Sequence, residues 1–237
     1  MFTAFALLST VLLQSADAPP TLELYTEHNP PFTYKQEETG EIGGATMAVV
    51  RELMQRADVP YSVELIPWKR AYSQTLRQKN ACVFGMNRTP EREKKFLWVS
   101  PLFEGPWSFF KRPDAAIELT SLADVAAYKV VATSGYASAL ALQQTGHEKI
   151  LLATSNERAM QLLFHGRVDL MMIGDFEAPY VAKTAGLPTP TNAMQFMEAF
   201  TGMGCNLDTD PSIIAKLQAA NAGMADFRKK TYSNVGN

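Results

Sequence analysis

The chain has 237 residues, of which 46% are hydrophobic and 19% are charged. This composition is too apolar for a disordered protein, and the length suits one large domain or two lobes of roughly 100 residues each. The formal net charge is -2, so there is no overall positive field to attract nucleic acid, and we expect no nucleic-acid partner.

The first 18 residues have the order of a secretory signal peptide. Residues 2–13 are almost wholly apolar, and the small residues of Ser15-Ala16-Asp17-Ala18 follow them, as in an h-region and its cleavage site. This apolar run is too short to span a bilayer, and a buried first helix is the alternative interpretation. We therefore predict a signal peptide over residues 1–18 and a soluble mature protein in the periplasm.

In the first half of the chain, short strand-like runs alternate with helical segments. Met47, Val50, Met54 and Ala57 recur at spacings of three and four, which predicts a helix over residues 45–57. Similar patterns predict a second helix over residues 69–79 and strands over residues 22–26, 61–66 and 81–85. This order implies parallel strands with helices covering the sheet.

The second half repeats the scheme. It contains predicted strands over residues 129–133 and 169–173 and helices over residues 137–144 and 178–185. Thr154 to Glu157 is typical of a capping box, and Asp210-Pro211 of the start of a last helix. Two units of similar length predict two lobes, with chain crossings near residues 108–112 and 200–205. The first lobe would hold residues 19–110 and 201–237, and the second residues 111–200.

Several short motifs follow one another along nearly the whole chain after residue 18. They are Pro30 to Tyr34, Gly43 before a helix, Gly85 to Arg92, Trp98 to Leu102, Val130 to Gly135, and Gly166 to Asp169 followed by Asp175. Their order and spacing resemble the family 3 extracellular solute-binding proteins of the polar-amino-acid type. The resemblance implies an α/β, type II periplasmic-binding-protein fold in which each of two lobes is a mixed sheet flanked by helices.

Within this resemblance, two charged residues take the main binding roles. The position of Arg92 in the Thr89-Pro90-Glu91-Arg92 motif implies that it binds the carboxylate of the ligand, for which a guanidinium offers two parallel donors. Asp175 would accept the ligand ammonium. The alternative for Arg92 is a surface ion pair with Glu91 or Glu93. The alternative for Asp175 is a helix N-cap.

Weaker ligand-binding candidates surround these two positions. Glu27 follows the first strand, Phe32 and Trp68 offer flat aromatic walls, and the remaining candidates come from the two loops expected at the cleft: Gly85, Asn87, Thr133 and Tyr136. Ordinary core packing, solvated strand ends and turn formation are the alternatives. The segment Gly43 to Met47 lacks the acidic pair usual in amino-acid-binding relatives, and Thr133 replaces a more polar or basic residue.

The two cysteines, Cys82 and Cys205, fall in segments that we assign to the first lobe. Export makes a disulfide between them chemically permissible, and we predict one. Two separate buried thiols are the alternative.

The chain lacks the motifs of common catalytic and metal sites. We find no phosphate-binding loop, nucleophile elbow or Cys-x-x-Cys, and His28, His147 and His165 have no metal-ligand spacing. We therefore expect no cofactor, no metal and no catalytic residue. The expected function is a monomeric binding protein for an amino-acid-like ligand that serves an ABC permease or a membrane sensor. The alternative is a small lyase or dehydratase on the same scaffold, with Glu27 and Asp175 as an acid/base pair.

Overall fold

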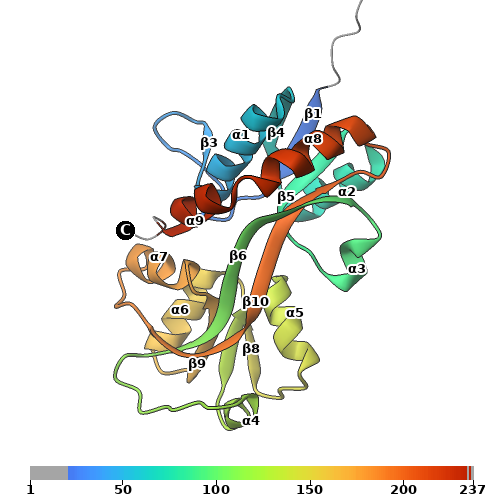
Figure 1. Cartoon of the computed structure of the whole chain (residues 1–237). Coiled ribbons are helices and arrows are strands. Elements are labelled where there is room, and N and C mark those ends of the chain that lie inside the picture. Colours follow the sequence, from blue (N-terminus) through green and yellow to red (C-terminus); the bar gives the residue numbers. More distant parts are fainter. Residues whose placement is uncertain (1–20, 234, 236–237) are drawn as a thin grey trace, which may run out of the picture.

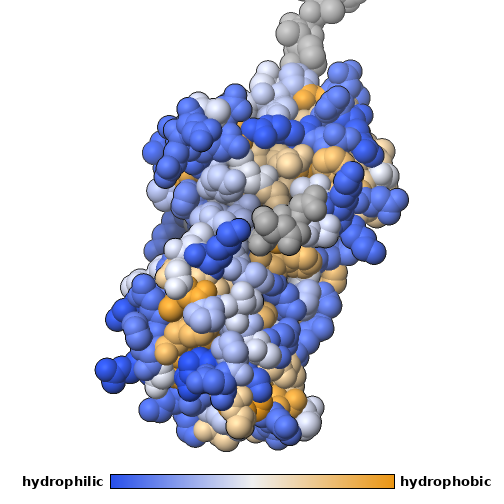
Figure 2. Space-filling model, turned by 90° about the vertical axis from the view of Figure 1, so that its left-hand side faces the viewer, coloured by the Kyte–Doolittle hydropathy of each residue, from blue (hydrophilic) through white to orange (hydrophobic). Residues whose placement is uncertain are grey.

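The computed structural model describes residues 21–233 and 235. The predicted signal peptide lies outside these residues. Among the helices of the described part, none is long and apolar enough to cross a membrane. Hydrophilic residues cover most of the face shown in Figure 2, and the apolar patches on that face are small.

The fold is mixed α/β and contains one eight-stranded sheet with the order β4-β1-β5-β10-β6-β9-β7-β8. Its first part joins β4 (Tyr61–Leu65), β1 (Leu22–Thr26) and β5 (Ala81–Asn87) in parallel. Its last part joins β9 (Leu170–Gly174), β7 (Val130–Thr133) and β8 (Ile150–Ala153) in parallel. A separate hairpin pairs β2 (Tyr34–Lys35) with β3 (Ile42–Gly43). The α/β class agrees with the sequence interpretation.

Two long antiparallel strands, β6 (Leu97–Lys111) and β10 (Thr191–Cys205), connect the two parts of the sheet. Figure 1 shows them running side by side from the upper to the lower half of the molecule. At one end β10 pairs with β5, and at the other β6 pairs with β9. Pro101, Gly105 and Pro106 interrupt the sequence pattern of β6, so only short crossing segments are predictable from the sequence.

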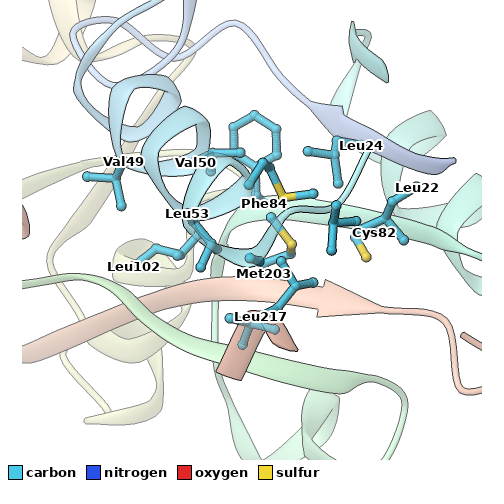
Figure 3. Close-up of a cluster of buried hydrophobic side chains, with 14 of the residues drawn as sticks. Leu22, Leu24, Val49, Val50, Leu53, Cys82, Phe84, Leu102, Met203 and Leu217 are labelled. Atoms are coloured by element: carbon cyan, nitrogen blue, oxygen red, sulfur yellow. The ribbon is translucent and has the colours of Figure 1, made fainter. Parts of the chain in front are cut away.

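The first lobe is built on β4, β1 and β5. One sheet face packs against α1 (Ala45–Ala57), α8 (Pro211–Ala222) and α9 (Ala225–Ser233). The last two helices follow β10 and return the chain to this lobe (Figure 1). Figure 3 shows the core that they share, including Leu24, Leu53, Phe84 and Leu217. Because neighbouring strand residues point to opposite faces, Tyr25 and Val83 belong instead to a cluster beside α2 (Trp68–Arg77).

The second lobe is built on β9, β7 and β8. Val131, Met171 and Ile173 pack with α6 (Asn156–Phe164) and α7 (Glu177–Thr184). The alternate strand residues pack with α4 (Leu122–Val125) and α5 (Ala137–Gln144) on the other face: Val130, Ala132, Leu170 and Met172. The residue boundaries of the lobes remain a prediction.

One local prediction is wrong. Helix α6 is capped by Ser155, whose hydroxyl accepts a hydrogen bond from the Arg158 amide at 3.1 Å. The capping-box motif predicts instead a cap at Thr154, with the Glu157 side chain accepting a hydrogen bond from the Thr154 amide. The shift of one residue arises because Ser155 still has extended backbone angles, with φ -153° and ψ 164°, so the helix begins only at Asn156.

The structure joins Cys82 and Cys205 by a disulfide. The two residues lie opposite each other in the β5–β10 ladder, and both are fully buried. The bond therefore lies within the sheet of the first lobe and ties the returning strand β10 to β5.

We predict that the unreduced protein, once denatured, contains no reactive thiol in a thiol titration. The cross-linked residues are 123 positions apart, so the bond removes much of the loop-closure entropy of the unfolded chain. In the double variant Cys82→Ala/Cys205→Ala, the free energy of unfolding should fall by up to about 5 kcal/mol, as measured by urea denaturation. Two reactive thiols in the wild-type protein would contradict the pairing.

Candidate functional site

A cavity of about 410 Å³ lies between the two lobes, beside the strands β6 and β10. The first lobe contributes the end of β1, the β5 segment around Gly85, and Arg92. The second lobe contributes the loop and helix start at residues 134–138 and residues 174, 176 and 177. Seven sequence-predicted residues line this cavity: Glu27, Phe32, Trp68, Gly85, Asn87, Arg92 and Tyr136.

Arg92 lies on the short helix α3 (Pro90–Glu93), which begins with proline at its first position. Its Nη1 donates to the Asn87 carbonyl at 3.0 Å. The guanidinium carbon lies 5.3 Å from the ring centre of Trp68 and 5.8 Å from that of Tyr72, within the range of cation–π attraction. The aromatic rings therefore hold the guanidinium at the cavity wall.

Arg92 makes no ion pair with any carboxylate of the described residues. Glu93, one of the two partners considered from the sequence, accepts instead from the Nε of Arg88 at 2.7 Å. Burial is the main influence on Arg92 and lowers its pKa, while nearby Tyr72, Glu91 and Glu27 oppose the change. The cavity thus contains a half-buried cation with unused hydrogen-bond donors, which is the chemistry of an anion site.

Around Arg92, the first lobe adds the carboxylate of Glu27 and a left-handed glycine, Gly85. Burial raises the pKa of Glu27, and the positive charge of Arg92 opposes this change. Gly85 lies within β5 but has a φ of 74°, a left-handed conformation that glycine adopts without strain. This conformation turns β5 toward the cavity between Phe84 and Asn87, which also line it.

The second lobe places Tyr136 in the cavity, immediately before α5. Burial raises its pKa well above the ordinary value, and the charges of Glu177 and Glu27 raise it further. The phenol therefore stays neutral and can donate a hydrogen bond. Thr133, by contrast, is buried, and its hydroxyl donates to the Asn156 side chain. It is absent from the lining.

The structure places Asp175 outside the cavity lining. Its amide donates to the Pro106 carbonyl at 3.1 Å, which extends the pairing of β9 with β6 by one residue. Its Oδ2 accepts from the Asn192 side chain on β10 at 3.0 Å. Asp175 does not cap α7 either, because Phe176 is the N-cap residue. The side chain therefore faces the connecting strands, which neither sequence interpretation anticipated.

Glu177 is an acidic residue of the cavity lining that the sequence interpretation missed. It is 9% exposed, and its Oε2 accepts from the Gly174 amide at 3.2 Å. Burial raises its pKa from the ordinary 4.5 to about 7, although the Gly174 hydrogen bond acts in the opposite direction. An acidic residue in the first turn of a helix is common because it favours the helix dipole, so the sequence offered no specific signal.

We predict that Glu177→Gln stabilises the protein above pH 7. Because the folded-state pKa is raised, the stabilising protonated form is fully present below about pH 4.5 and is lost as the pH rises through about 7. The variant has no such loss, so its advantage in unfolding free energy should grow by up to roughly 3 kcal/mol between pH 4 and pH 8. Urea denaturation at both pH values measures this difference.

The exposed helix residue Glu157 provides the matched control. Glu157→Gln should change the unfolding free energy by a similar small amount at both pH values. An equal stability of Glu177→Gln and wild-type protein at pH 8 would show that the carboxylate is solvated in the folded state.

The model for the bacterial extracellular solute-binding proteins, family 3, matches residues 23–233. No curated protein matches the chain.

Solved structures share the fold at low sequence identity. A histidine kinase sensor domain with similarity to periplasmic binding proteins is 15% identical, with a TM-score of 0.76 and coverage of 92% of this chain and 96% of that chain. The ancestral amino acid-binding protein AncCDT-1, a precursor of cyclohexadienyl dehydratase, is 23% identical, with a TM-score of 0.73. The match covers 92% of this chain and 96% of that chain. The arginine-bound form of truncated ArgBP from T. maritima is 17% identical, with a TM-score of 0.69. The match covers 86% of this chain and 96% of that chain.

Proposed function

Because the chain belongs to family 3 of the bacterial extracellular solute-binding proteins, we propose that it binds a small amino-acid-like solute in the cavity between its lobes. The observation that carries this proposal is Arg92, a half-buried guanidinium at the cavity wall without a carboxylate partner among the described residues. A ligand carboxylate would satisfy its free donors in a charge-assisted, bidentate contact.

The shape of the cavity supports a small ligand. Its volume of about 410 Å³ falls in the range of small-molecule sites, and its aromatic walls come from both lobes. A ligand in this position contacts residues on either side of β6 and β10. Its binding would therefore favour a closed arrangement of the lobes over an open one, because only the closed arrangement offers both sets of contacts.

We further propose that the protein acts as a monomer in the periplasm and delivers its ligand either to an ABC permease or to a membrane sensor. Solute-binding family membership supports an extracellular or periplasmic location. Similarity to a sensor domain is a similarity of fold. Uptake of labelled ligand by cells with and without the gene would decide between transport and sensing.

We predict that Arg92→Ala lowers ligand affinity by roughly 30-fold or more, because it removes a charge-assisted contact from a partly buried site. A thermal-shift screen of the twenty amino acids identifies the ligand, and calorimetry measures its affinity for each variant. The matched control is Arg88→Ala, which removes a nearby arginine that pairs with Glu93 and does not line the cavity. Wild-type affinity in Arg92→Ala would refute the carboxylate assignment.

A second candidate function is a small lyase or dehydratase. The observation that favours it is a cavity carboxyl, Glu177, with a pKa of about 7, the range in which a general acid or base works best at neutral pH. The neighbouring Tyr136 would add a neutral hydrogen-bond donor.

Turnover decides between binding and catalysis. We predict that the best-binding amino acid remains chemically unchanged after long incubation with the protein, as followed by mass spectrometry. Formation of a product that disappears in Glu177→Gln, but persists in Asp175→Asn, would establish the lyase instead.

A further inference from the structure

The ligand ammonium requires an acceptor that faces the cavity. We propose that Glu177, in its ionised form, accepts the ammonium group of the ligand, the role that the sequence motif suggested for Asp175. This inference rests on the proposed function, since it concerns the same cavity and an amino-acid-like ligand.

The first argument is the position of the two carboxyl groups. Glu177 lines the cavity together with Tyr136, whereas Asp175 does not line it. The Oδ2 of Asp175 accepts from Asn192, and its Oδ1 is buried without a hydrogen-bond partner in the described part of the chain, away from the cavity lining. Neither oxygen is therefore placed to meet a ligand in the cavity. Within the described residues, the side chain of Glu177 has one hydrogen bond, from the Gly174 amide to Oε2, so the carboxyl retains unused acceptor capacity.

The second argument is the space that Gly174 leaves. A Cβ atom built on Gly174 would lie 2.8 Å from Oε2 of Glu177, which is closer than real Cβ contacts allow. The carboxyl group therefore occupies the volume that a side chain at the end of β9 would fill. Because Gly174 has no side chain, the carboxyl of Glu177 lies at the end of β9, although Glu177 itself belongs to the first turn of α7.

The third argument is the distribution of charge across the cavity. Glu27 and Arg92 lie on the first lobe and interact with each other electrostatically. The charges of both Glu177 and Glu27 raise the pKa of Tyr136, which belongs to the second lobe. A zwitterionic ligand with its carboxylate on Arg92 can thus place its ammonium against Glu177, so that opposite lobes hold opposite ends of the ligand.

The protonation state of Glu177 then links affinity to pH. Burial raises its pKa to about 7. The other charged or titratable residues of the cavity lining are Glu27, Lys69, Arg92 and Tyr136, and Glu157 lies near Tyr136. An ammonium group beside the carboxyl favours the charged form. Ligand binding should therefore release a proton below about pH 7, and affinity should fall by up to about tenfold for each pH unit below that value.

The experiment measures binding of the twenty L-amino acids, and then of the tightest one by calorimetry from pH 5.5 to pH 8.5. Two buffers with different ionisation enthalpies give the number of protons released. The variants are Glu177→Gln, the shorter acid Glu177→Asp, and Asp175→Asn as the matched control. The corresponding carboxylic acid that lacks the amino group serves as a second ligand.

We expect Glu177→Gln to lower affinity at pH 8 at least tenfold and to abolish both proton release and pH dependence. Asp175→Asn should keep the wild-type affinity, proton release and pH dependence. The ligand without an amino group should bind the wild-type protein and Glu177→Gln with equal affinity. Thermal unfolding confirms that each variant is folded.

Three results overturn the inference. One is wild-type affinity and pH dependence in Glu177→Gln; another is loss of binding in Asp175→Asn alone; the third is tighter binding of the amino acid at low pH, which would indicate a protonated Glu177 that donates. In each of these cases Arg92-dependent binding still supports the proposed function. If none of the twenty amino acids binds the wild-type protein, the proposed function and this inference both fail.

Discussion

The antiparallel pairing of β6 with β10 is the constraint on which the rest of the structure depends. The ladder runs from Leu97 opposite Cys205 to Lys111 opposite Thr191 and contains three shifts of register. Backbone hydrogen bonds in this ladder hold the two lobes in one continuous sheet, while the irregularities allow the strands to bend and twist. The cavity lies beside the middle of these strands, where Phe103, Trp107, Ala199 and Thr201 line it.

Three ionisable residues of the cavity lining, Glu27, Arg92 and Glu177, are partly or fully buried, which disfavours their charged forms. Burial lowers the pKa of Arg92 and raises the pKa of Glu27 and of Glu177. In each case desolvation by burial is the largest cause of the pKa shift. The interactions within the folded protein therefore do not fully replace the hydration that these charged groups lose. Such uncompensated ionisable groups in a cavity are typical of a ligand site, because a ligand supplies the missing partner.

An aromatic cluster connects the C-terminal helix to the cavity. Tyr232 on α9 lies 4.5 Å from the ring centre of Phe103, which in turn lies 5.5 Å from Phe176 in the second lobe. The Tyr232 hydroxyl is 3.0 Å from the Thr46 hydroxyl on α1. The return of the chain to the first lobe therefore supports the cavity wall directly, since Phe103 and Phe176 both line the cavity.

The sequence by itself determined the local elements and pointed to one side of the candidate site. Strand 22–26 and the helices 45–57 and 137–144 follow from periodicity, which depends only on neighbouring residues, and the Thr89-Pro90-Glu91-Arg92 motif identified the arginine that lines the cavity. Tertiary structure alone decided the other side. Whether Asp175 or Glu177 reaches the cavity depends on the pairing of Asp175 with Pro106 and on the space above Gly174. The first contact joins segments that are distant in the sequence, and the second spans the turn between β9 and α7. No local sequence pattern specifies where a side chain points once the strand has ended.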